Sequence, residues 1–203
     1  MMKSILVAAA VAGASAFAPA QVGKTSTSLN AFENEIGAMV PLGFFDPLGL
    51  LKDADQAEFD RLREVEIKHG RISMLATVGY LTTASGYRFP DFPADVPAGL
   101  GAWKALASTS DGQNILGQMA IFFALAEAAN RNVDWNDGWE PEFPGDYRNG
   151  SLDWGWDRFD DATKIKKRTI ELNQGRAAMM GILGLMVHEM MGVSIIFPNP
   201  SGL

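Results

Sequence analysis

The chain of 203 residues contains no cysteine. This absence excludes a disulfide-stabilised scaffold, a zinc site built on thiolates, an iron–sulfur cluster and a cysteine nucleophile. An excess of positive charge is also missing, because 17 Lys and Arg stand against 24 Asp and Glu, which gives a net charge of −7 and a pI near 4.8. Nucleic-acid binding needs a basic face to neutralise phosphates, so no nucleic-acid partner is expected.

Recognisable catalytic motifs are absent as well. The sequence contains no glycine-rich phosphate loop, no nucleophile–base–acid set and no conventional cofactor fingerprint. We therefore expect a protein that is not an enzyme. The mean hydropathy of +0.01 suggests a soluble domain at first sight, but this value averages segments of very different character.

The first 30 residues have the composition of a targeting segment. Lys3 precedes a short apolar run at 5–14, which ends on small residues as a signal peptide does, and the stretch 21–30 is rich in Ser and Thr and lacks acids, like a transit peptide. The join Ala-Phe-Ala-Pro at 16–19 resembles the bipartite presequence of algae whose plastids arose by secondary endosymbiosis. We expect this presequence at 1–30 and a single domain at 31–203; an ordinary secretory signal is the alternative.

Three long helices are predicted in that domain, at about 55–86, 112–130 and 161–197. The first begins at a variant of the capping box, with Asp55 at the N-cap and Glu58 three residues later. The third is expected to stop at Pro198 and Pro200.

The apolar stretches of these helices have the length of membrane spans. Residues 66–87 would cover about 33 Å and residues 177–197 about 31 Å, close to the roughly 30 Å of a hydrocarbon core. The middle stretch is marginal, at about 22 Å. We therefore predict an all-α membrane protein with three transmembrane helices, of which the first and third are long and the middle one is short. A soluble helical bundle is the alternative.

A nine-residue pattern occurs in both the first and the third predicted helix. Each copy reads Glu-x-x-(His/Gln)-Gly-Arg-x-x-Met, starting at Glu66 and, 105 residues later, at Glu171. Such a repeat implies two related helices that pack about a pseudo-twofold axis. The glycines of the two copies, Gly70 and Gly175, would let the two backbones approach closely where the helices cross.

The spacing within the pattern predicts how its charges pair. Glu and Arg five residues apart lie about 140° apart around a helix, whereas good pairs within one helix are three or four residues apart. We therefore expect reciprocal pairs across the axis, Glu66 with Arg176 and Glu171 with Arg71, because unpaired charges near a bilayer are costly. Solvated charges on two surface helices are the alternative.

Further polar side chains lie singly in apolar surroundings and have no charged partner in the pattern: His69, Glu127, Gln174 and His188. A lone histidine on an apolar face is usually a hydrogen-bonded core residue. Single nitrogen or oxygen donors would, however, suit a metal that needs one protein ligand. The magnesium of a chlorophyll is such a metal, since four ring nitrogens leave an axial site open to carboxylate, amide or imidazole.

The chain resembles the fucoxanthin–chlorophyll a/c proteins of the light-harvesting chlorophyll-binding superfamily over essentially all of 31–203. The motifs that carry the resemblance are GFFDPLGL at 43–50, FDRLR at 59–63, EIKHGRISMLA at 66–76, NGSLDWGWD at 149–157 and ELNQGRAA at 171–178. The Ala-Phe-Ala-Pro presequence agrees with them independently.

The resemblance implies a three-helix thylakoid protein, with its N-terminus in the stroma, whose first and third helices cross. It further implies that Glu66 and Glu171 are chlorophyll ligands whose charges Arg176 and Arg71 compensate. The other axial ligands that it implies are His69, Gln174, His188 and Glu127, with Gln118 as a secondary candidate.

The same resemblance implies an antenna that absorbs light and passes excitation to a photosystem. The expected cofactors are chlorophyll a, chlorophyll c and fucoxanthin, with a diadinoxanthin-type xanthophyll as an open further candidate, and the chlorophyll magnesium is the expected metal. The expected partners are other antenna subunits, in a homo- or hetero-oligomer, the core of photosystem I or II, and thylakoid lipids.

Three other functions stay open at this point. One is a photoprotective member of the same superfamily, and a second is a membrane protein without pigment. The third is a di-iron enzyme, because Glu66 and His69 match the Glu-x-x-His element of di-iron bundles. The second copy of the pattern, however, carries Gln174 at the position of the histidine.

Overall fold

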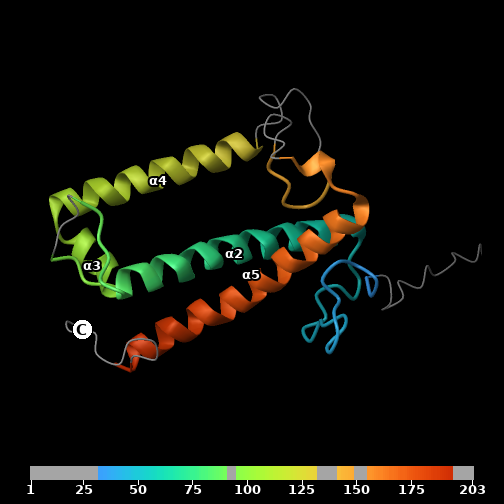
Figure 1. Cartoon of the computed structure of the whole chain (residues 1–203), viewed down its shortest axis with the longest axis horizontal. Coiled ribbons are helices and arrows are strands. Elements are labelled where there is room, and N and C mark those ends of the chain that lie inside the picture. Colours follow the sequence, from blue (N-terminus) through green and yellow to red (C-terminus); the bar gives the residue numbers. More distant parts are fainter. Residues whose placement is uncertain (1–31, 91–94, 132–140, 149–154, 194–203) are drawn as a thin grey trace, which may run out of the picture. The chain divides into compact units, whose positions relative to one another are not determined.

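The computed structural model describes residues 32–90, 95–131, 141–148 and 155–193. The predicted presequence at 1–30 lies outside these residues. The described part is helical, in the order α2 (Gln56–Ala84), α3 (Gly101–Ala107), α4 (Ser110–Arg131), the 3₁₀ turn η3 (Trp156–Arg158) and α5 (Asp161–Met190) (Figure 1).

The three predicted long helices correspond to α2, α4 and α5, but a three-helix arrangement is not confirmed. The described residues contain four α-helices, because the short α3 precedes α4 and packs against it. Seven residues give too few turns for an apolar periodicity to stand out in the sequence. The predicted start of α2 is correct, since Asp55 Oδ1 accepts a hydrogen bond of 2.9 Å from the backbone N–H of Glu58.

The predicted end of the third helix was also wrong. Helix α5 ends at Met190, before the predicted 197, and Pro198 and Pro200 lie outside the described residues. Gly192 adopts a φ of 70° just beyond the end. Its N–H donates to the Glu189 carbonyl at 2.9 Å, and the Val193 N–H donates to the His188 carbonyl at 3.0 Å. These bonds form a Schellman motif, which stops the helix without a proline.

The helices that were predicted to span a membrane are not recognisable as membrane spans from their length and hydropathy. Among the helices in the described part of the chain, none is at once long enough and apolar enough to qualify as a membrane-crossing segment.

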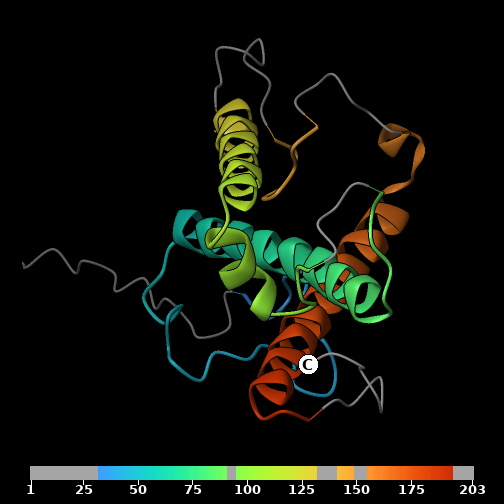
Figure 2. The same ribbon diagram turned by 90° about the vertical axis from the view of Figure 1, so that its left-hand side faces the viewer.

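Helices α2 and α5 cross, and their crossing is the main contact between long helices (Figures 1 and 2). The residues buried at the crossing include Ile67 and Gly70 of α2 and Leu172 and Gly175 of α5. A Cβ added to Gly70 would lie 2.9 Å from the Cα of Gly175, and one added to Gly175 would lie 3.0 Å from the Cα of Gly70. The two backbones are therefore in direct contact at the predicted glycines, and the crossing positions the charged residues of both repeat copies.

Away from the crossing, the long helices expose large apolar side chains. They come from all three helices: Ile72, Leu75 and Val78 of α2, Ile121, Phe122 and Leu125 of α4, and Met180 and Leu183 of α5. The described residues thus have a small core and extended apolar helix faces that the described part of the chain does not cover.

Candidate functional site

The two ion pairs predicted from the repeat are both present at the crossing. Arg176 Nε lies 2.7 Å from Glu66 Oε1, and Arg71 Nε lies 2.6 Å from Glu171 Oε1. The glutamate side chains are 27% and 32% exposed, so each carboxylate is neutralised by the opposite helix while part of its surface stays accessible. A half-buried, charge-compensated carboxylate can accept a further ligand on its outer side.

Each arginine of these pairs also holds a loop. Arg176 Nη1 donates a 2.7 Å hydrogen bond to the Gly37 carbonyl, and Arg71 Nη1 donates one of 2.7 Å to the Gly145 carbonyl. Both glycines have positive φ, 105° and 85°, a region that favours glycine. Each guanidinium therefore joins three parts of the chain, namely its own helix, the opposite helix and a loop.

Each loop contacts the helix of the other repeat copy. Gly37 precedes α2 and contacts both helices, since an added Cβ would be 3.0 Å from Arg63 Nη1 of α2 and 3.3 Å from Leu172 Cδ1 of α5. Gly145 precedes α5 but lies on α2, where an added Cβ would be 3.0 Å from Ile67 Cγ2. Sequence reasoning missed this relation because the two loops share no motif; the common feature is a glycine placed before each helix.

The two repeat copies differ in whether a second cation contacts the glutamate. Arg63 Nη1 lies 2.6 Å from Glu66 Oε2, so both oxygens of Glu66 meet a guanidinium. The corresponding residue of α5, Arg168, is half-buried and lies over the ring of Phe143, with its guanidinium carbon 4.2 Å from the ring centroid. The electrostatic surroundings of the two glutamates are therefore unequal.

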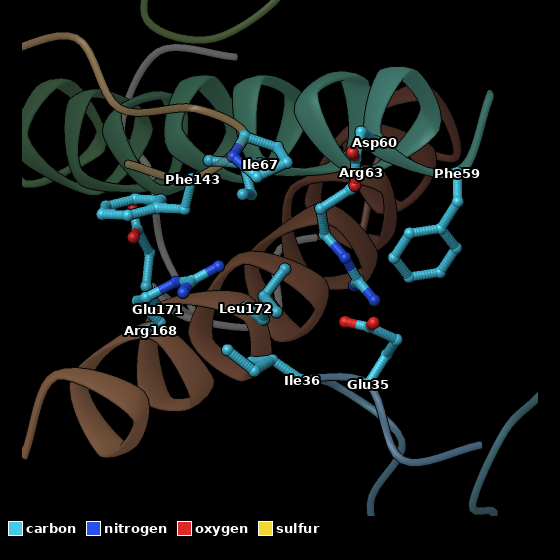
Figure 3. A pocket seen from close by; sticks show the side chains of 11 residues that line it. Glu35, Ile36, Phe59, Asp60, Arg63, Ile67, Phe143, Arg168, Glu171 and Leu172 are labelled. Atoms are coloured by element: carbon cyan, nitrogen blue, oxygen red, sulfur yellow. The ribbon is translucent and has the colours of Figure 1, made fainter. Parts of the chain in front are cut away.

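A small cavity lies between these two arginines. Figure 3 shows Arg63 at one end of it and Arg168, with Phe143, at the other, with Leu172 between them. Its volume of about 30 Å³ is space for about two water molecules. This cavity, which Glu171 also lines, is too small for a pigment macrocycle.

His69 is exposed on α2, and its ring orientation is fixed. Its Nδ1 lies 2.8 Å from the Val65 carbonyl, which can only accept, so Nδ1 carries the proton. In the uncharged form of the ring, the other nitrogen, Nε2, is an acceptor that can bind a metal, and a hydrogen bond of this kind is the usual support of a ligating histidine.

The remaining neutral candidates are less well supported. Gln118 and Gln174 are exposed on α4 and α5. His188 is half-buried near the end of α5, and within the described residues its buried Nδ1 has no hydrogen-bond partner. His188 therefore lacks the supporting hydrogen bond that His69 has.

Glu127 has a charged partner that the sequence did not reveal. Lys68 Nζ of α2 lies 2.9 Å from Glu127 Oε2 of α4. The two residues are 59 positions apart and belong to no common pattern, so no spacing rule could have found the pair.

The di-iron hypothesis requires several ligands in one place. In the ranges that the structure describes, no group of three or more His, Asp or Glu side chains is arranged to hold a metal ion. Within the described residues, the Glu-x-x-His element at Glu66 and His69 therefore lacks the further ligands that a di-iron site needs.

Comparisons with known proteins point to one family. Residues 32–190 match the family model described as chlorophyll A-B binding protein. Fucoxanthin-chlorophyll a-c binding protein D of Phaeodactylum tricornutum is 52% identical over 96% of this chain and 99% of its own length. The corresponding protein of Trieres chinensis is 51% identical over 96% of this chain and 97% of its own length, and protein B of Macrocystis pyrifera is 44% identical over 93% and 91%.

Proposed function

Since the chain belongs to the chlorophyll a-b binding protein family, we propose that it is a light-harvesting antenna polypeptide that binds chlorophyll a, chlorophyll c and fucoxanthin. It absorbs light through these pigments and passes the excitation energy to a photosystem. The observation in the structure that carries this proposal is the pair of half-buried glutamates, Glu66 and Glu171, each neutralised by an arginine of the opposite helix.

The chemistry of these residues suits the magnesium of chlorophyll. When bound, the pigments supply the light absorption and the excited state that is passed on. A carboxylate binds magnesium well but adds a negative charge, and Arg176 and Arg71 offset that charge at Glu66 and Glu171. His69 would ligate through Nε2 of its imidazole ring, and because imidazole ligates as an uncharged group it needs no compensating cation.

We further propose that Gln174, His188 and Glu127 would hold chlorophyll magnesium, with Gln118 as a secondary candidate. All four lie on α4 or α5, helices that also carry exposed apolar side chains which a pigment ring could cover. The ion pairs at the crossing hold α2 and α5 in register, while the apolar faces offer the low-dielectric surroundings that pigments need.

The location and partners follow from the same premise. We propose that α2, α4 and α5 cross the plastid thylakoid membrane with the N-terminus in the stroma. Helices α2 and α5 have 29 and 30 residues, which gives each a length of about 44 Å, enough for a core of about 30 Å. The expected partners are other antenna subunits, the core of photosystem I or II, and thylakoid lipids.

Reconstitution tests the proposed function. The full chain is refolded in detergent with chlorophyll a, chlorophyll c and fucoxanthin, and the purified product is analysed by pigment extraction and fluorescence excitation. We expect a coloured complex in which light absorbed by fucoxanthin and chlorophyll c excites emission from chlorophyll a. A folded product that retains no pigment would refute the proposal.

A further inference from the structure

Lys68 and Glu127 form an ion pair that joins α2 to α4. The nitrogen–oxygen distance is 2.9 Å, and the side chains are 29% and 47% exposed. Lys68 is also held from the side, because its Nζ lies 5.9 Å from the centre of the Tyr147 ring, and the hydroxyl of Tyr147 donates to Glu64 Oε1 at 3.0 Å. The ammonium group is thus held in place by a cation–π contact with an anchored ring.

The proposed magnesium ligands form two groups, charged carboxylates and uncharged side chains. Each glutamate among them has a cation from another helix: Arg176 for Glu66, Arg71 for Glu171 and Lys68 for Glu127. The other proposed ligands, which are histidines and glutamines, are neutral groups and need none. Because the magnesium and its macrocycle are together neutral, a carboxylate ligand leaves one uncompensated negative charge in apolar surroundings, and a nearby cation offsets the cost.

We propose that Lys68 is a positioning residue for a chlorophyll bound at Glu127, where it compensates the charge of the ligand and fixes the orientation of the carboxylate. This inference rests on the proposed function. Helix α2 would then contribute to two kinds of pigment site. Glu66 and Arg71 act at the crossing with α5, and Lys68 acts at the site on α4. The ion pair also joins α4 to α2 beside the repeat copy of α2.

An ion pair that only stabilises the packing of α2 against α4 would have the same geometry. The test must therefore distinguish compensation of the ligand's charge from stabilisation of the helix contact. Three variants do so: K68Q, E127Q and the double variant K68Q/E127Q. Each full chain is refolded with chlorophyll a, chlorophyll c and fucoxanthin, and the chlorophyll bound per polypeptide and the circular dichroism of the pigment bands are measured.

If Lys68 acts by compensating charge, K68Q loses about one chlorophyll, because removing a group that supports a metal ligand weakens metal binding about 10- to 100-fold. E127Q keeps that chlorophyll, since the amide oxygen ligates without adding charge. The double variant also keeps it, because a neutral ligand needs no cation. A double variant that loses the pigment as K68Q does would overturn the inference, and so would a K68Q variant that keeps it.

Two further variants keep the outcome clear if folding suffers. Arg61 and Glu58 form an exposed ion pair on the same helix, with a nitrogen–oxygen distance of 2.6 Å. R61Q removes a cation from α2 without touching a proposed ligand, so it should bind as much pigment as the unchanged chain. E127A should lose the same chlorophyll as K68Q. If E127A keeps every chlorophyll, Glu127 is not a ligand and this inference fails while the antenna function stands; if the unchanged chain binds no pigment, the proposed function itself fails.

Discussion

Gly70 of α2 and Gly175 of α5 are in backbone contact, so close that a Cβ on either glycine would fall within 3.0 Å of the other's Cα. Each glycine directly precedes the arginine of its own repeat copy, and both arginines form ion pairs across the crossing. The distance between the helices, and with it the geometry of both ion pairs, depends on the absence of a side chain at these two positions.

Replacing Gly70 by Ala should therefore push the helices apart. The Cα of Gly175 cannot yield as a flexible side chain would, so G70A should destabilise the pigment complex by about 1–3 kcal/mol. Thermal loss of the pigment circular-dichroism bands measures this effect. Gly79 is the matched control, because it lies in the same helix and an added Cβ would meet nothing within 4 Å. G79A should leave the complex unchanged or slightly more stable, since Ala favours the helix.

The two arginines of the reciprocal pairs should differ in importance. Glu66 retains Arg63 when Arg176 is removed, whereas Arg71 provides the only ion pair of Glu171 in the described part of the chain. We expect R71Q to reduce the yield of the pigment complex about tenfold, because it strands a carboxylate, and R176Q to reduce it less. The yields are compared after refolding at equal pigment and protein concentrations. An R176Q yield as low as that of R71Q would show that Arg63 does not compensate Glu66.

His69 should bind a single chlorophyll through its neutral ring. H69L removes the nitrogen ligand and should lose about one chlorophyll per polypeptide. H69Q should retain most of it, because an amide oxygen can take the axial position as the proposed Gln174 does in the second copy. Pigment extraction after purification gives the count. Equal chlorophyll content in H69L and the unchanged chain would exclude His69 as a ligand.

Asp146 should make the stability of the loop before α5 depend on acid pH. Its carboxylate is buried, and burial alone would raise its pKa. Hydrogen bonds from the Arg148 guanidinium, at 2.6 and 2.8 Å, and from backbone N–H groups outweigh that effect and leave the pKa below its usual value of 3.8. A carboxyl whose pKa is lower in the folded state stabilises the fold above the pKa of the unfolded state, and this contribution disappears as the pH falls through the folded value.

D146N should therefore destabilise the protein at neutral pH, and the difference from the unchanged chain should shrink below about pH 4. Thermal unfolding followed by far-ultraviolet circular dichroism, from neutral pH down to about pH 3, measures the difference. A gap between the two proteins that stays constant over this range would show that the charge of Asp146 does not contribute.

The repeat determined much of the crossing in advance. Glu and Arg five residues apart cannot pair well within one helix, so the repeat predicted that the two copies exchange partners. The pairing of Glu66 with Arg176, and that of Glu171 with Arg71, follow from this geometry. The start of α2 could also be predicted from the local sequence, because the N-cap Asp55 needs only the backbone N–H three residues later as its hydrogen-bond donor. Patterns of this kind are readable because helix geometry converts sequence spacing into direction.

Other features could be known only from the tertiary structure. The end of α5 depends on the conformation of Gly192, and a glycine in a sequence does not disclose its φ. The contact of Lys68 with Glu127 joins two helices without a common motif. The same holds for the loop carbonyls of Gly37 and Gly145, which accept from the two arginines of the repeat.

The sequence by itself thus determined which residues bear charge, which glycines allow close approach, and which family the chain resembles. The tertiary structure decided which charges meet across separate helices and loops. The physical reason is that spacing within a helix fixes direction only along that helix, whereas an ion pair such as Lys68–Glu127 depends on how two helices are placed in space.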